Sequence, residues 1–181
     1  MFPQFPSWDA IHPLIVHFPI VLTLIAPVFV LLAVILRKYN RVFAACALAL
    51  MIGGTVGAIL AVSSGEAGAE LAEQVPGAEP VLEEHEELAE TTRTLLVVVT
   101  VVYALIVFAP LTFKKLLNPA PWIALNLGFL VLYFFPAVSL INASHQGAVL
   151  VHKYGAHANI SADAPTLHAS EEGEGHEEED E

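Results

Sequence analysis

Histidines are the residues of this sequence with the most chemistry to offer, and four of them border long apolar stretches. His12 and His17 stand at the start of the first stretch, His85 precedes the third, and His145 follows the fourth. A neutral imidazole can ligate haem iron, copper or zinc, and it exchanges protons near neutral pH. What these side chains do therefore depends on whether the fold brings them together.

The apolar stretches predict an all-α membrane protein. The 181 residues are 56% hydrophobic and only 14% charged, whereas an ordinary globular domain carries roughly 25% charged residues. Four stretches, residues 11–36, 42–62, 95–111 and 121–141, contain almost no charge. A helix needs about 17–25 apolar residues to cross a bilayer. We therefore expect a bundle of four transmembrane helices.

The segments that follow the second span, precede the third and follow the fourth are rich in helix-forming residues. We expect them to extend helices two, three and four beyond the membrane on one side, with a turn at 75–81. The predicted organisation is an N-terminal outer segment (1–10), a four-helix transmembrane domain (11–154) and an acidic tail (155–181). The tail is a run of like charges and is expected to be disordered.

Basic residues predict the orientation of the bundle. Arg37, Lys38 and Arg41 lie between the first two spans, and Lys114 and Lys115 lie between the last two. Short loops rich in Lys and Arg stay in the cytoplasm. We therefore expect a multi-pass protein of the bacterial inner membrane with both termini outside.

Helix geometry places several polar side chains at one level. With a rise of about 1.5 Å per residue, His12, Glu66, His85 and His145 all lie roughly 36–39 Å from the cytoplasmic ends of their helices. His17 lies deeper, inside the hydrocarbon region. A polar group at that depth normally faces the bundle interior. The sequence thus predicts a His/Glu cluster near the outer face of the bilayer.

Small residues in the second span suit close packing between helices. Gly53, Gly54, Gly57 and Ala58 include a Gly-x-x-x-Gly pattern. Side chains this small let two helix backbones approach one another within a membrane. We expect this face to pack inside the bundle.

Several of these motifs together resemble a known family. The opening run HPLIVHFPI, residues 12–20, looks like the signature of the DUF2231 family of bacterial membrane proteins. Residues 64–68, His85-Glu86 and residues 144–147 fit further patterns of that family, although Ala148 stands where the family pattern has a second glycine. The likeness covers residues 8–154. It implies a four-helix membrane domain and assigns no chemistry.

The first functional hypothesis is electron transport by a b-type haem. Histidines from facing helices commonly hold haem in a helical bundle. The chain has a single cysteine and no Cys-x-x-Cys-His motif, so a haem would be bound without covalent attachment. His17 and His145 are the expected axial ligands, with His12 and His85 as alternates. Glu66 would orient a ligand imidazole.

Two other hypotheses stay open. The same cluster suits copper or zinc, held by His17 and His145 with His85 and His152 as alternates. Alternatively, the chain is a structural accessory subunit whose histidines are only hydrogen-bonded. An enzyme is less expected, because the sequence lacks a Ser/His/Asp motif, a phosphate-binding glycine loop and an HExxH motif.

The charge balance bears on the partners. The formal net charge of −12 argues against binding to nucleic acid. Membrane lipids are expected partners, and a periplasmic redox partner or a larger membrane complex is left open. Arg93 is a basic residue outside the two loops, and it is expected to pair with either a haem propionate or Glu90.

Overall fold

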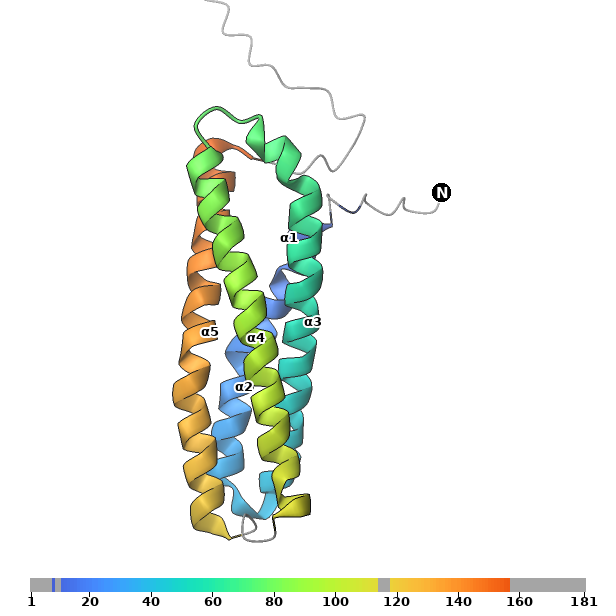
Figure 1. Cartoon of the computed structure of the whole chain (residues 1–181), viewed down its shortest axis with the longest axis vertical. Helices are drawn as coiled ribbons and strands as arrows, with labels where there is room; N and C mark the ends of the chain where they lie inside the picture. Colours follow the sequence, from blue (N-terminus) through green and yellow to red (C-terminus); the bar gives the residue numbers. More distant parts are fainter. Residues whose placement is uncertain (1–7, 9–10, 114–117, 157–181) are drawn as a thin grey trace, which may run out of the picture.

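Four long helices dominate the computed structural model, which describes residue 8, residues 11–113 and residues 118–156. The elements in chain order are α1 (His12–Ile15), α2 (His17–Ile35), the short 3-10 turn η1 (Arg37–Tyr39), α3 (Asn40–Glu73), α4 (Glu79–Thr112) and α5 (Pro119–Tyr154) (Figure 1). Four segments are long and apolar enough to cross a membrane: α1 with α2, α3, α4 and α5. The predicted all-α, four-span architecture and the long extensions of α3, α4 and α5 are confirmed.

Parts of the sequence-based prediction fall outside the described residues. These are the N-terminal segment except Trp8, the pair Lys114 and Lys115, and nearly all of the acidic tail. Within the described part, the indole Nε1 of Trp8 donates a hydrogen bond to the backbone oxygen of Ser63, at 3.3 Å. This contact ties the start of the chain to α3.

The helix boundaries follow from proline and glycine. Pro80 stands in the first turn of α4, where its missing N–H costs nothing, so the turn between α3 and α4 covers residues 74–78 and not 75–81 as predicted. Gly77 takes a left-handed conformation in that turn, with φ of 77°. Gly155 ends α5 in the same way, with φ of 69°, which is a common helix stop.

The four long helices form a closed cycle. Each packs against its neighbour in the chain, and α2 also packs against α5. Within the described residues, α2 does not pack on α4, nor α3 on α5. The helices α2 and α4 are therefore diagonally opposite. The short α1 packs only on α2 and α3.

The bundle has two ends with different character. The end that carries η1 and the exposed side chains of Arg37, Lys38 and Arg41 is called the basic end below. The opposite end, where residues 74–78 join α3 to α4, is called the histidine end. In Figure 1 the basic end is at the bottom and the histidine end is at the top.

Buried polar side chains in the basic half form hydrogen bonds across helices. The Tyr133 hydroxyl donates to the backbone oxygen of Thr23 at 3.0 Å, which links α5 to α2. The Tyr103 hydroxyl donates to the amide oxygen of Asn126 at 3.2 Å, which links α4 to α5. Because no water is available in hydrocarbon, such pairing offsets the cost of burying these hydroxyl groups.

The contact between α2 and α3 depends on glycine. A methyl group added at Gly57 would lie 2.9 Å from Cδ of Pro19, and one added at Gly54 would lie 3.1 Å from the Thr23 hydroxyl. The two backbones can approach this closely only because these positions carry no side chain. The predicted packing role of the small residues in the second span is confirmed.

We expect Gly57→Ala to destabilise the bundle by about 1–3 kcal/mol, the usual cost of overpacking a tight contact. Thermal unfolding of the detergent-solubilised protein, followed by circular dichroism, measures the effect. Gly128→Ala is the matched control, because nothing lies within 4 Å of the added methyl group. Equal melting temperatures for wild type and Gly57→Ala would contradict this account of the α2–α3 contact.

Candidate functional site

His12 is held against α3 at the histidine end. Its ring Nδ1 lies 2.8 Å from the backbone oxygen of Ala61 and 3.1 Å from the hydroxyl of Ser64. A methyl group added at Gly65 would lie 3.1 Å from Cε1 of the ring. The imidazole therefore occupies the space that a side chain at position 65 would need.

His85 makes the same arrangement between the other two helices. Its Nδ1 lies 2.9 Å from the backbone oxygen of Ala143 on α5. A methyl group added at Gly147 would lie 3.1 Å from Cε1 of this ring. His12 reaches from α1 to a carbonyl and a glycine on α3, and His85 reaches from α4 to a carbonyl and a glycine on α5.

The shared spacing of alanine and glycine has a geometric cause. In both cases the accepting carbonyl is four residues before the glycine, Ala61 before Gly65 and Ala143 before Gly147. A helical side chain leans toward the N-terminus and covers the preceding turn. A side chain at the glycine position would therefore cover the carbonyl, and glycine leaves it open to a ring from the neighbouring helix.

These hydrogen bonds fix the protonation of both rings. A carbonyl oxygen can only accept, so Nδ1 must carry the proton and, in the neutral ring, Nε2 must carry a lone pair. Within the described residues neither Nε2 has a hydrogen-bond partner. His12 and His85 thus each hold one ring nitrogen in place and leave the other available to a ligand.

The two histidines belong to diagonally opposite corners at the histidine end of the bundle. His12 is the first residue of α1, which continues into α2, and α2 is diagonally opposite α4, the helix that carries His85. The carbonyls that hold the two rings, Ala61 on α3 and Ala143 on α5, likewise lie on diagonally opposite helices. The equal heights that the sequence predicts for His12 and His85 stay a prediction.

The apolar core is interrupted at the same level. One cluster of buried hydrophobic residues ends at Ala58 on α3, and a second begins at Ala72. Between them the Thr92 and Ser139 hydroxyls share a hydrogen bond of 2.7 Å across α4 and α5. The buried side chains of this layer are mostly small or polar, namely Ala61, Val62, Ser64, Thr92, Pro136, Leu140 and Ala143.

The structure does not place His17 where the sequence predicted. Its ring is exposed instead of facing the bundle interior, and its Nδ1 lies 2.7 Å from the backbone oxygen of Pro13 in the preceding turn. The prediction of an interior His17 is wrong because a carbonyl of its own segment satisfies the ring.

The remaining candidates are also on the surface. His145 and His152 on α5 are exposed, and neither forms a side-chain hydrogen bond within the described residues. Glu66 is exposed as well. The carbonyls of Ala61 and Ala143 orient the partly buried imidazoles, which is the role that the sequence had suggested for Glu66.

A metal site built from protein ligands alone gains no support. No group of three or more His, Cys, Asp or Glu side chains that could hold an ion is found in the part of the chain that the structure describes. A copper or zinc site made of His17, His145, His85 and His152 would need such a group.

Comparison with known proteins settles the family. The model of the predicted membrane protein family DUF2231 matches residues 8–159. The chain belongs to the DUF2231 family. The resemblance inferred from the motifs is thereby confirmed. No curated protein and no solved structure matches the chain.

The glycine partners are the part of the site that motif reading missed in this DUF2231 protein. Gly65 and Gly147 lie within motifs that carried the family resemblance. Their packing against the rings of His12 and His85 depends on contacts between helices, which a motif does not contain. The Ala-x-x-x-Gly spacing at Ala61 and Ala143 also occurs at Ala49 and Ala124, so the spacing alone does not distinguish the two glycines that pack against histidines.

We expect neutral His12 and His85 to be protonated on Nδ1 in the cofactor-free protein, because each Nδ1 faces a carbonyl oxygen. Nitrogen-15 NMR of histidine-labelled protein in detergent distinguishes the two tautomers. Exposed His145 serves as the comparison and should show the averaged signals of a solvated ring. An Nε2-protonated tautomer at His12 or His85 would show that the ring does not donate to the carbonyl.

Proposed function

We propose that this membrane protein binds a b-type haem without covalent attachment and carries electrons near one face of the membrane. His12 and His85 are the proposed axial ligands. The observation that carries the proposal is the matched pair of imidazoles, each anchored through Nδ1 to the carbonyl of a neighbouring helix. This is the arrangement in which an imidazole ligates a metal through Nε2.

The donor set fits haem better than a free metal ion. A porphyrin supplies four nitrogen ligands of its own, so two histidines complete the coordination of its iron. Copper and zinc sites made only of protein side chains need more ligands than the described residues bring together. The sequence-based choice of His17 and His145 remains untested, but their exposure favours His12 and His85.

The surroundings of the two rings also support a flat cofactor. Gly65 and Gly147 are covered by the imidazoles themselves, and the main cluster of large apolar side chains ends before this level, at Ala58 on α3. The buried side chains of this layer are mostly small or polar, so a ring system between the helices would displace few large ones. The hydrogen bond at Nδ1 makes each imidazole a more basic ligand.

When bound, haem would supply reversible one-electron transfer. The chain's own residues would hold the iron, exclude water from part of the ring and keep the site at one end of the bundle. We propose that the basic end, with exposed Arg37, Lys38 and Arg41, faces the bacterial cytoplasm. The site would then exchange electrons on the outer side, with a periplasmic redox protein or a larger membrane complex.

We expect wild-type protein, expressed with ample haem and purified in detergent, to show the α-band of a six-coordinate b-type haem in a reduced-minus-oxidised spectrum. His12→Ala and His85→Ala should each abolish this band, because either change removes an axial ligand. His17→Ala and His145→Ala are matched controls at exposed rings and should retain it. Circular dichroism of each variant checks that the helices persist.

The outcomes separate the alternatives. A colourless wild-type protein would overturn the haem proposal and favour a structural accessory subunit. Loss of the band in His17→Ala or His145→Ala, with retention in the other two variants, would restore the sequence-based pair of ligands.

A further inference from the structure

Arg93 lies on α4 at the point where the acidic extension meets the apolar span. It is eight residues from His85, or about 12 Å along the helix axis, and the apolar run begins two residues later at Leu95. Its side chain is about one third exposed. This is the depth at which lipid headgroups meet acyl chains.

The guanidinium of Arg93 has weak partners within the described residues. Its nearest carboxylate oxygen, on Glu90, is 3.9 Å away, and the Glu90 side chain is 60% exposed. An exposed ion pair of this length contributes little. Arg93 therefore keeps most of its five N–H donors for another anion.

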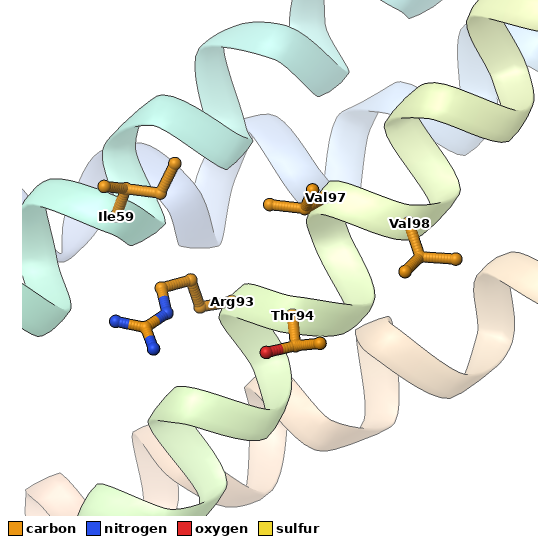
Figure 2. A pocket seen from close by; sticks show the side chains of 5 residues that line it. All are labelled: Ile59, Arg93, Thr94, Val97 and Val98. Carbon is orange, nitrogen blue, oxygen red and sulfur yellow. The ribbon is translucent and has the colours of Figure 1, made fainter.

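Arg93 lines a shallow, open groove of about 410 Å³ between α3 and α4. Figure 2 shows Arg93 reaching from α4 toward α3, which carries Ile59; Thr94 is next to Arg93 on α4, and Val97 and Val98 lie one turn further along. Ile59, Val97 and Val98 are each about 40–50% exposed. The groove thus combines a cation with an apolar wall that faces lipid.

A second groove, of about 270 Å³, continues along α4 toward the histidine end. Thr94 lines both grooves, and the second also contains the carboxylates of Glu87 and Glu90. A cation and two anions are therefore arranged along one path on α4, in the order that leads away from the apolar span.

We propose that these grooves bind one phospholipid with a primary ammonium headgroup, phosphatidylethanolamine. Arg93 binds the phosphate, Glu87 and Glu90 accept hydrogen bonds from the ammonium group, and an acyl chain lies against Ile59, Val97 and Val98. The charge pattern selects this headgroup, because a lipid with a net negative charge would meet the two carboxylates. Phosphatidylcholine carries the same charges, but its quaternary ammonium has no N–H to donate.

The test uses the full chain in detergent, titrated separately with phosphatidylethanolamine, phosphatidylcholine and phosphatidylglycerol of identical acyl chains. Native mass spectrometry counts the lipids retained. We expect the wild type to retain one phosphatidylethanolamine in preference to the other two lipids. Arg93→Gln should weaken its binding roughly tenfold, the loss expected for one charge-assisted contact.

Two further variants sharpen the result. Glu87→Gln combined with Glu90→Gln should remove the preference for phosphatidylethanolamine over phosphatidylglycerol. Lys153→Gln, which removes an exposed cation on α5 at the same end of the bundle, should change nothing. Thermal unfolding shows whether each variant keeps the fold.

Unchanged lipid retention in Arg93→Gln would overturn the proposal. Equal or tighter retention of phosphatidylglycerol by the wild type would overturn the assignment of the headgroup. Neither result depends on haem, so this proposal and the proposed function can fail separately.

Discussion

The hydrogen bond from an imidazole Nδ1 to a helix carbonyl organises the histidine end of the bundle. A carbonyl oxygen can accept more than one hydrogen bond, so Ala61 and Ala143 can each accept a ring N–H in addition to a helical amide, and the Ala61 oxygen also accepts from the Ser64 hydroxyl. The contact requires an uncovered carbonyl, which Gly65 and Gly147 provide. Both rings are partly removed from water, and the bond to the carbonyl, joined at His12 by the contact with the Ser64 hydroxyl, holds each ring at a defined place between two helices.

These bonds depend in turn on how closely the helices pack. Lipid offers no hydrophobic driving force between helices, so small residues and shape complementarity set their spacing. Gly54 and Gly57 bring α3 against α2, and this contact places α1 and His12 beside Ala61. The pairing of α4 with α5 places His85 beside Ala143. Two helix pairs, each with one imidazole packed against a glycine of the neighbouring helix, close into the four-helix cycle.

The buried side chains differ in size between the two halves of the bundle. Large buried side chains such as Tyr103, Tyr133 and Met51 fill the basic half, where their packing holds the spans together. The layer around the histidines contains smaller buried side chains, among them Ala61, Ser64 and Thr92. A cofactor site is easier to place in such a layer because it displaces fewer large core side chains. The lipid site proposed at Arg93 lies outside the cycle, on the groove between α3 and α4, so the two sites do not compete for space.

The sequence by itself determined the spans, the helical extensions and the small-residue packing face. Hydropathy and the helical rise govern these properties, and both can be read one segment at a time. Only the tertiary structure decided which histidines turn inward. His17 sits deep by sequence, but Pro13 supplies its carbonyl locally and leaves it exposed. His145 lies near Gly147 in sequence, yet it is His85, from another helix, whose ring packs against Gly147. Such choices depend on which helix faces are neighbours, and a single helix does not contain that information.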